Sequence, residues 1–277
     1  MKRVLAISGG VDSMVLLDFC VRKFGNQDIV VAHFNHGTRK SCEDDEKFLK
    51  KRCEEYQVQC SIGHGSLGEG VSEELAREKR YEFLRKVAKE NSGKISTAHH
   101  LDDLCESVAI NFLRGTGWRG LAVLGAEDVE RPLISWTRKD ILKYAAKNEI
   151  RFREDPTNSS EKYLRNRIRK SVRNLPISTK QDLSNLREKQ LEISPKIEET
   201  LREILPKTGK YDREFFKNVD DKIGIEALRF ILSEANLSAT RPQTLDFLHA
   251  IRTYNPGKFF NLPNDKLVRV DKNSFVI

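Results

Sequence analysis

Short apolar runs alternate with longer amphipathic stretches along the first hundred residues, and few folds accommodate this alternation. The apolar runs predict strands at residues 3–7, 29–34, 58–62 and 95–98. The amphipathic stretches predict helices at residues 13–24, 43–56, 72–90, 101–113 and 138–148. The RPLI segment at residues 131–134 predicts a further short extended segment. Because parallel strands are joined by crossover helices, this order predicts an α/β fold with a doubly wound, mostly parallel sheet.

The pattern changes beyond about residue 174. Helical patterns cover residues 178–205, 220–235 and 242–252, and we expect Pro195 to break the first of them. Residues 255–277 alternate strand patterns with turn residues. We therefore predict a Rossmann-like α/β domain at residues 1–177. A smaller, mainly helical domain ending in a β-hairpin is predicted at residues 178–277.

Composition restricts the classes of protein to which the chain can belong. The mean hydropathy is −0.56, and the sequence has no apolar run of membrane-spanning length. The first apolar run is too short for a signal peptide, so we expect a cytoplasmic protein without a membrane partner. The five cysteines form no CxxC pair, which favours free packing thiols over a zinc site. A homodimer is left open.

The chain carries a net charge of +8, which alone is equally compatible with solubility and with nucleic-acid binding. The distribution is more informative than the total. Residues 165–173 (RNRIRKSVR) hold five cations in nine positions without an acidic residue. A solvated helix face would normally interleave both signs, so this stretch indicates an anionic partner.

The strongest motif is the SGGVDS loop at residues 8–13, between the first predicted strand and helix. A glycine pair at this position lets phosphates approach backbone N–H groups and the positive end of a helix. Ser8 and Ser13 could add hydroxyl donors, and Asp12 could help to hold Mg²⁺. No lysine follows the glycines, which excludes a Walker A loop. The alternative is a glycine-rich turn without a ligand.

A second polar segment, at residues 97–106 (TAHHLDDLCE), joins a predicted strand to a predicted helix. Strand ends meet at the ligand crevice of a doubly wound sheet, so this junction should lie beside the first loop. Asp103 and Glu106 are three residues apart and should share a helix face. Such carboxylates could bind Mg²⁺, hold a cationic amine or accept its proton. Alternatively, Asp102 and Asp103 suit the positive N-terminus of a helix.

Two arginines fall on an apolar helical stripe. Arg77 and Arg80 share this stripe with Leu84 and Val87, so the spacing predicts that both arginines face the core. Buried arginine requires an anion, and either glutamates of the same helix or nucleotide phosphates would serve.

Residues 115–120 (GTGWRG) match the GxGxxG pattern of dinucleotide-binding proteins. They follow a predicted helix and not a strand, so the context excludes a dinucleotide site. We expect a flexible loop near the active site.

SGGVDS is similar to the signature of the PP-loop, or N-type, ATP pyrophosphatases. The set of motifs resembles the bacterial tRNA(Ile)-lysidine synthases over about 170 residues. The motifs are SGGVDS, HFNHGTR (33–39), EELAREKRYEFL (73–84), TAHHLDDLCES (97–107), LRGTGWRGL (113–121), RPLI and EDPTNSSEKYLRNRIR (154–169). Leu104, Cys105 and Ser107 depart from the residues common in that family. Many members carry a further C-terminal domain that grips the acceptor stem, and this sequence stops before it.

The resemblance implies a defined reaction with ATP, Mg²⁺, tRNA and free L-lysine. ATP would adenylate the C2 carbonyl oxygen of the wobble cytidine in the CAU anticodon of an isoleucine tRNA. The ε-amine of lysine would then displace AMP and form lysidine. Residues 1–177 would be the catalytic domain and residues 178–277 the tRNA-substrate domain.

The resemblance also implies roles for individual residues. Catalysis would involve Asp12, His99, Asp103 and Glu106, with Asp12 and Asp103 also holding Mg²⁺. ATP would be bound by Ser8, Gly9, Gly10, Val11, Asp12, Ser13, His33, Arg77 and Arg80. tRNA would be bound by Arg114, Gly115, Gly117, Arg165, Asn166, Arg167 and Arg169.

Three alternatives share parts of this pattern. A tRNA 2-thiolation enzyme would use the same loop, but such enzymes usually carry cysteine pairs or an iron–sulfur site. A PP-loop ligase acting on a small molecule would not need the basic segment at residues 165–173. A catalytically inactive RNA-binding module would not need Asp12, Asp103 and Glu106 together.

Overall fold

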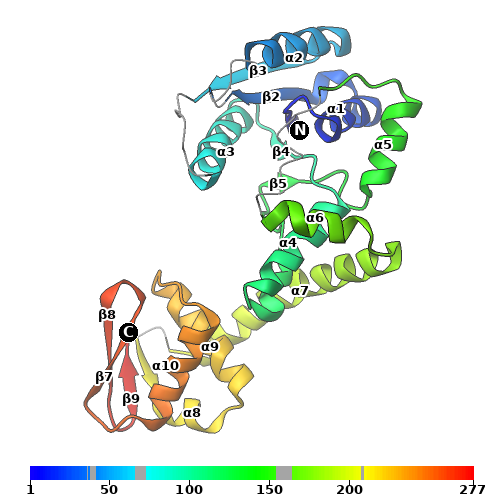
Figure 1. Ribbon diagram of the computed structural model, residues 1–277. Coiled ribbons are helices and arrows are strands. Elements are labelled where there is room, and N and C mark those ends of the chain that lie inside the picture. The colour runs from blue at the N-terminus through cyan, green and yellow to red at the C-terminus, as the bar shows by residue number, and fades with distance from the viewer. Residues whose placement is uncertain (36, 38–41, 66–72, 154–163, 207–208) are drawn as a thin grey trace. The chain divides into compact units, whose positions relative to one another are not determined.

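The computed structural model describes residues 1–35, 37, 42–65, 73–153, 164–206 and 209–277, with the backbone alone at residues 42, 43, 73, 164–166 and 264 (Figure 1). The chain forms two compact units. The N-terminal unit comprises Met1–Ile110 and Val123–Asn185, and the C-terminal unit comprises Asn111–Ala122 and Leu186–Ile277. One division between the units thus falls inside the helix α7 (Ile177–Ile204). The predicted functional division of the chain stays a prediction.

The N-terminal unit contains a five-stranded parallel sheet with the order β3-β2-β1-β4-β5. Its strands are β1 (Arg3–Ala6), β2 (Ile29–Asn35), β3 (Gln59–His64), β4 (Lys94–Ser96) and β5 (Val129–Glu130). The predicted fold class and the first four strands are confirmed. The extended segment predicted at residues 131–134 is wrong, because the strand ends at Glu130 and a turn follows. Leu133 in this turn is fully buried in the core, which explains the apolar signal.

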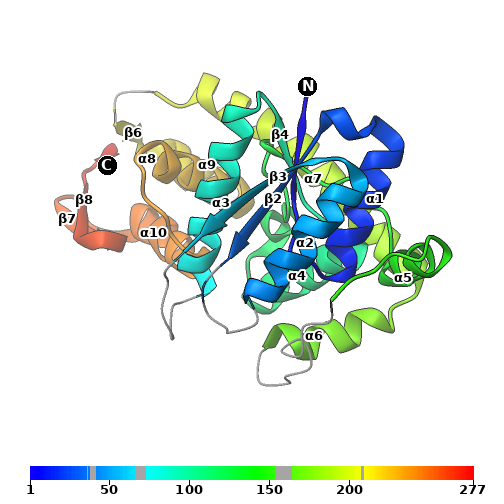
Figure 2. The ribbon, with the colours of Figure 1, turned by 90° about the horizontal axis from the view of Figure 1, so that it is seen from above.

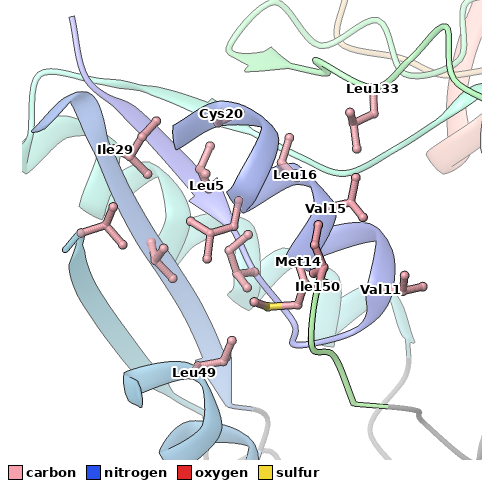
Figure 3. Packing of buried hydrophobic residues seen from close by; sticks show 14 of the residues in the cluster. Leu5, Val11, Met14, Val15, Leu16, Cys20, Ile29, Leu49, Leu133 and Ile150 are labelled. Atoms are coloured by element: carbon pink, nitrogen blue, oxygen red, sulfur yellow. The ribbon is translucent and has the colours of Figure 1, made fainter. Parts of the chain in front are cut away.

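Helices cover both faces of this sheet, as Figures 1 and 2 show. The described helical segments before α7 and outside η2 are α1 (Val11–Phe24), η1 (Asn26–Asp28), α2 (Cys42–Tyr56), α3 (Glu73–Glu90), α4 (Leu101–Leu113), α5 (Arg138–Lys147) and α6 (Leu164–Arg173). Residues of α1, α2 and α5 pack with Leu5, Ile29 and Val31 in one apolar cluster (Figure 3). Residues of α3 pack against the other sheet face, on Val4 and Val30. Successive side chains of β1 and β2 point to opposite faces, so these strands contribute buried residues to both layers.

The strand order places a topological switch point between β1 and β4. The connection after β1 leads through α1 to β2 on one side, and the connection after β4 leads towards β5 on the other. In open α/β sheets, ligands bind beyond the carboxyl ends of the strands at such a point. A ligand-binding site is therefore expected at the loops that follow β1 and β4.

The C-terminal unit packs several helices, the end of α7 among them, against a four-stranded antiparallel sheet with the order β6-β9-β8-β7. Its elements are η2 (Gly117–Leu121), α8 (Arg213–Asn218), α9 (Asp221–Glu234), α10 (Arg241–Thr253), β6 (Lys210–Asp212), β7 (Lys258–Leu262), η4 (Pro263–Asp265), β8 (Lys266–Val270) and β9 (Ser274–Val276). Phe216, Phe247 and Phe275 are fully buried and contact one another edge to face in its core.

The strand pattern at residues 255–277 is confirmed, because β7 and β8 form the predicted hairpin and β9 pairs with β8. β6 pairs with β9 and extends the sheet to four strands. The break predicted at Pro195 is wrong, because α7 continues through it to Ile204. Proline removes one backbone donor from a helix, and this loss does not end α7. No described helix combines the length and apolarity needed to cross a bilayer.

Candidate active site

The loop between β1 and α1 is held in shape by a hydroxyl of its own. Ser13 Oγ accepts hydrogen bonds from the backbone N–H groups of Ser8 (3.2 Å) and Gly9 (3.1 Å), and donates one to the Gly10 carbonyl (2.8 Å). Gly9 has φ +90°, a conformation that other residues rarely adopt. The Ser13 hydroxyl therefore stabilises the loop itself, and its predicted hydrogen bond to a phosphate stays a prediction.

The N-terminus of α1 is open to an anion. Its first residue is Val11, and the preceding residue, Gly10, provides no side-chain cap. The first amides of a helix lack intrahelical acceptors and carry the positive end of the helix dipole. A glycine pair leaves these amides accessible at close range. The local structure thus has the features of a phosphate-binding turn.

The loop between β4 and α4 places a buried imidazole between carboxylates from two strand ends. His100 Nε2 lies 3.8 Å from Asp12 Oδ1 and 3.5 Å from Asp103 Oδ2. Its Nδ1 lies 3.9 Å from Asp102 Oδ2. Asp12 follows β1 and Asp103 follows β4, so the two loops meet at the switch point. Sequence reasoning singled out His99 and missed His100.

His99 is kept neutral by its surroundings. Burial is the main cause that lowers the pKa of His99 to about 4, and the positive charges of Arg131, Arg77 and Arg80 lower it further, against an opposing effect of Asp103. His99 Nδ1 also lies 2.8 Å from Thr97 Oγ1. At neutral pH this side chain therefore acts as an uncharged imidazole.

Arg77 and Arg80 are less buried than their helical spacing predicts. Arg77 is exposed and Arg80 is partly buried, while Leu84 and Val87 of the same stripe are buried. The prediction that both arginines face the core is wrong, because the apolar cluster under α3 includes Leu84 and Val87 and neither arginine. Their charges still act on His99, so they lie within electrostatic range of the site.

Asp102 is a buried structural carboxylate. Lys180 Nζ donates to its Oδ1 at 2.5 Å, and the backbone N–H of Arg138 donates to its Oδ2 at 2.7 Å. Asp102 therefore joins α4 to the starts of α5 and α7. The sequence analysis considered only the helix N-terminus for this residue. For Asp103 that explanation does apply, because its Oδ2 accepts from the His100 N–H at 3.0 Å.

Two further arginines reach the candidate carboxylates. Arg138, at the start of α5, forms an ion pair with Asp12, which no pattern in the sequence predicts. Arg169 of α6 donates from Nε to Glu106 Oε1 at 3.1 Å. Glu106 is 2% exposed, whereas the Asp103 side chain is 19% exposed. One arginine of the basic stretch at residues 165–173 thus contacts the buried carboxylate of α4.

The remaining predicted residues are placed as follows. His33 is buried, and its Nδ1 lies 2.8 Å from the Ile7 carbonyl, where it links the ends of β1 and β2. Arg167 is exposed on α6. The side chains of Arg165 and Asn166, and much of the EDPTNSSEKY and NHGTR motifs, lie outside the described residues.

The glycine-rich segment at residues 115–120 belongs to the C-terminal unit. Most of it forms η2, which Trp118 Nε1 and Arg119 Nε fix to Glu226 at 3.0 and 2.6 Å. The prediction of a flexible loop is therefore wrong for this segment. Gly115 and Gly117 have φ +72° and +64°, and Arg114 is exposed.

Within the described residues, no group of three or more histidine, cysteine or acidic side chains could hold a metal ion. Asp12 and Asp103 nevertheless face the same edge of His100. Magnesium commonly takes one or two protein carboxylates together with substrate phosphates. The carboxylate pair beside an open helix N-terminus fits an ion that arrives with a nucleotide.

The doubly wound sheet, with a glycine-rich turn at its switch point, defines a class of α/β proteins that bind nucleotide phosphates. Residues 1–175 match the family model of the PP-loop domain. The chain belongs to the PP-loop family.

Curated relatives extend this similarity beyond one domain. The chain is 33% identical to a tRNA(Ile)-lysidine synthase of Thermosipho africanus, over 98% of this chain and 62% of that protein. It is 36% identical to a tRNA(Ile)-lysidine synthase of Thermotoga maritima, over 61% of this chain and 44% of that protein. The chain therefore spans less than two thirds of the length of these relatives.

Among solved structures, the chain resembles the U34-tRNA thiolase NcsA of Methanococcus maripaludis. The TM-score is 0.59 at 23% identity, and the match covers 69% of this chain and 72% of that one. At this identity the likeness supports the fold alone.

Proposed function

We propose that this protein uses ATP to ligate lysine to C2 of the wobble cytidine in an isoleucine tRNA with a CAU anticodon, forming lysidine in the cytoplasm. One observation carries the proposal: Asp12 of the SGGVDS turn and Asp103 of α4 face the same imidazole edge. A carboxylate suited to amine chemistry thus lies beside the turn suited to phosphates. The similarity to lysidine synthases adds the substrates.

In the first step, ATP binds with its phosphates at the open N-terminus of α1. The C2 carbonyl oxygen of cytidine attacks the α-phosphorus, the bond between the α-phosphorus and its bridging oxygen to the β-phosphorus breaks, and pyrophosphate leaves. The backbone N–H groups at the start of α1 stabilise the negative charge that develops on the phosphates. Neutral His99 can hydrogen-bond to nucleotide or base without adding a further positive charge.

In the second step, the uncharged ε-amine of lysine attacks C2, the bond between C2 and the adenylate oxygen breaks, and AMP leaves. The amine must lose protons to act as a nucleophile and to complete the product. The Asp103 side chain is 19% exposed beside the phosphate turn, which makes it accessible to this amine. Glu106 is buried and paired with Arg169, so we assign it the role of neutralising and positioning that arginine.

Asp12 and Asp103 would hold Mg²⁺ together with the phosphates. The ion would supply charge neutralisation on the pyrophosphate leaving group. Arg138 pairs with Asp12 and adds a positive charge beside that carboxylate.

The basic face of α6 would contact tRNA. Arg167 is exposed there, whereas Arg169 is directed to Glu106. This arrangement connects RNA binding to a buried residue of the site. Arg114 with Gly115 and Gly117 would supply a second contact from the C-terminal unit.

The test is transfer of radiolabelled lysine to an unmodified isoleucine tRNA with a CAU anticodon, with and without ATP. The methionine tRNA with the same anticodon is the control. We expect ATP-dependent labelling of the isoleucine tRNA alone. If pyrophosphate is released with another tRNA and no lysine is incorporated, the adenylation stands and lysine is discarded as the nucleophile. A 2-thiolation enzyme would then be tested with a sulfur donor.

The catalytic assignment is tested by Asp103→Asn, with Asp128→Asn as a surface control. Asp128 pairs with Arg85 on the protein surface. We expect Asp103→Asn to lose lysidine formation by at least two orders of magnitude while ATP still binds, as for loss of a general base. Unchanged turnover of Asp103→Asn would refute its catalytic role.

A further inference from the structure

Three arginines gather around η2 in the C-terminal unit, and we refer to Arg119, Arg229 and Arg241 as the arginine cluster. Arg119 lies in η2, Arg229 lies on α9, and Arg241 is the first residue of α10. The two long helices lie side by side in Figure 1. Arg119 and Arg241 both act electrostatically on Arg229, so the three guanidinium groups share one region.

Two carboxylates in this region form ion pairs with Arg119. Arg119 Nε donates to Glu226 Oε2 at 2.6 Å, and Arg119 also lies 3.6 Å from Glu198 Oε1. The second oxygen of Glu226 accepts from Trp118 Nε1 at 3.0 Å. Arg119 is thereby neutralised and fixed in place.

The other two arginines are not balanced in this way. In the part of the chain that the structure describes, Arg229 Nε is buried without a hydrogen-bond partner. No described carboxylate forms an ion pair with Arg241. Burial is the main cause that lowers the pKa of Arg229; the negative charge of Glu226 opposes it, and the charges of Arg119 and Arg241 lower the pKa further. Two adjacent cations, one of them partly desolvated, are stable together when an anion joins them.

The backbone beside these arginines allows a close approach. Gly117 has φ +64°, and a Cβ at this position would come within 3.4 Å of Arg241 Nη1. The glycine therefore leaves room directly beside the guanidinium. Planar guanidinium groups bind phosphate oxygens in a forked geometry that lysine cannot reproduce.

We propose that Arg229 and Arg241, next to Gly117, form a binding site for a backbone phosphodiester of the RNA substrate. The site rests on the proposed function for the identity of that RNA. It assigns α9 and α10 a direct part in RNA binding, in addition to the basic face of α6. The hydrogen bonds from Trp118 and Arg119 to Glu226 hold η2 in place beside the site.

The test measures the salt dependence of binding to the unmodified isoleucine tRNA by fluorescence anisotropy, without ATP. The variants are Arg229→Gln, Arg241→Gln and the double variant of the full-length chain. Each phosphate contact contributes roughly 0.7 to 0.9 to the slope of log affinity against log salt. We expect the slope of the double variant to fall by about 1 to 2, with tRNA affinity roughly tenfold weaker at low salt.

Arg269→Gln is the matched control, because it removes one positive charge from the same unit. Arg269 is exposed on β8 and paired with Asp271. Its slope should equal that of the wild-type protein. Thermal unfolding of each variant shows whether a loss of binding reflects a loss of folding. Arg229→Lys keeps the positive charge and loses the forked donor geometry of the guanidinium group. Compared with Arg229→Gln, it should recover only part of the wild-type salt-dependence slope.

The outcomes separate this inference from the proposed function. If wild-type protein incorporates lysine and the double variant keeps the wild-type slope, the phosphate site is refuted and the function stands. If the double variant instead loses affinity for ATP at an unchanged slope, the anion is a nucleotide phosphate and the RNA assignment is refuted. If wild-type protein binds tRNA without incorporating lysine, a reduced slope in the double variant still supports the site. Absence of tRNA binding by the wild-type protein refutes both.

Discussion

Lys180 donates a 2.5 Å hydrogen bond to Asp102, and both side chains are more than nine-tenths buried. Asp102 also receives the backbone N–H of Arg138. One carboxylate thereby fixes the starts of α5 and α7 against α4, next to the residues proposed to act on substrate. This pair supports the site through the backbone of Arg138 and beside His100, whose Nδ1 lies 3.9 Å from Asp102 Oδ2.

Lys180→Met should lower the free energy of unfolding by about 3–5 kcal/mol, because it leaves the Asp102 charge buried without its partner. Urea unfolding followed by circular dichroism measures the change. Lys196→Met removes a surface lysine paired with Glu192 and should have no measurable effect. The double variant Lys180→Met/Asp102→Leu should recover part of the loss, and no recovery would show that Lys180 stabilises through packing instead.

Stability should decrease in mildly acidic solution because of His99. The pKa of His99 is lowered from 6.5 to about 4, so between these values the unfolded chain binds a proton that the folded protein does not. The contribution of neutral His99 to the free energy of unfolding is therefore fully present above pH 6.5 and is lost as the pH falls towards 4. Between pH 6.5 and 5 the loss attributable to His99 is about 2 kcal/mol.

The measurement compares the free energy of unfolding of wild-type protein and His99→Gln at pH 7 and pH 5. The glutamine variant cannot titrate, so it should lose less stability over this range. His64→Gln, at an exposed histidine, controls for histidine titration in general. Equal pH dependence in wild-type protein and His99→Gln would show that His99 is not buried in its neutral form.

The elements were predictable from the sequence, but several contacts within the site were not. β1, the SGGVDS turn and α1 follow from local patterns, since apolar period and glycine position act over a few residues. The Asp12–Arg138 pair joins residues 126 positions apart, and the Glu106–Arg169 pair joins residues 63 apart. Such pairs depend on how helices pack, and charge patterns along the chain do not specify partners. The same limit explains the misplacement of Arg77, whose helical stripe continues past the apolar cluster.

Arg138→Gln should lower the Mg²⁺ concentration needed for half-maximal ATP-dependent pyrophosphate release, by several-fold. Arg138 pairs with Asp12, so it competes with a cation for that carboxylate. Lys139→Gln, at the next residue on the exposed face of α5, should leave the Mg²⁺ requirement unchanged. A higher Mg²⁺ requirement in Arg138→Gln would mean that Arg138 binds the phosphates themselves.

The glycine pair of the SGGVDS turn should respond unequally to alanine. Gly9 has φ +90°, so Gly9→Ala is strained and should lower the free energy of unfolding by about 1 kcal/mol or more. Gly10 lacks this strain, and a Cβ there would meet only Ser8 Oγ at 3.7 Å, an ordinary contact. We expect Gly10→Ala to fold with wild-type stability and to bind ATP at least tenfold more weakly, because the methyl group limits the approach of phosphate to the first turn of α1. Thermal unfolding and equilibrium binding of ATP separate the two effects. If Gly10→Ala binds ATP with wild-type affinity, the phosphates do not bind at this turn.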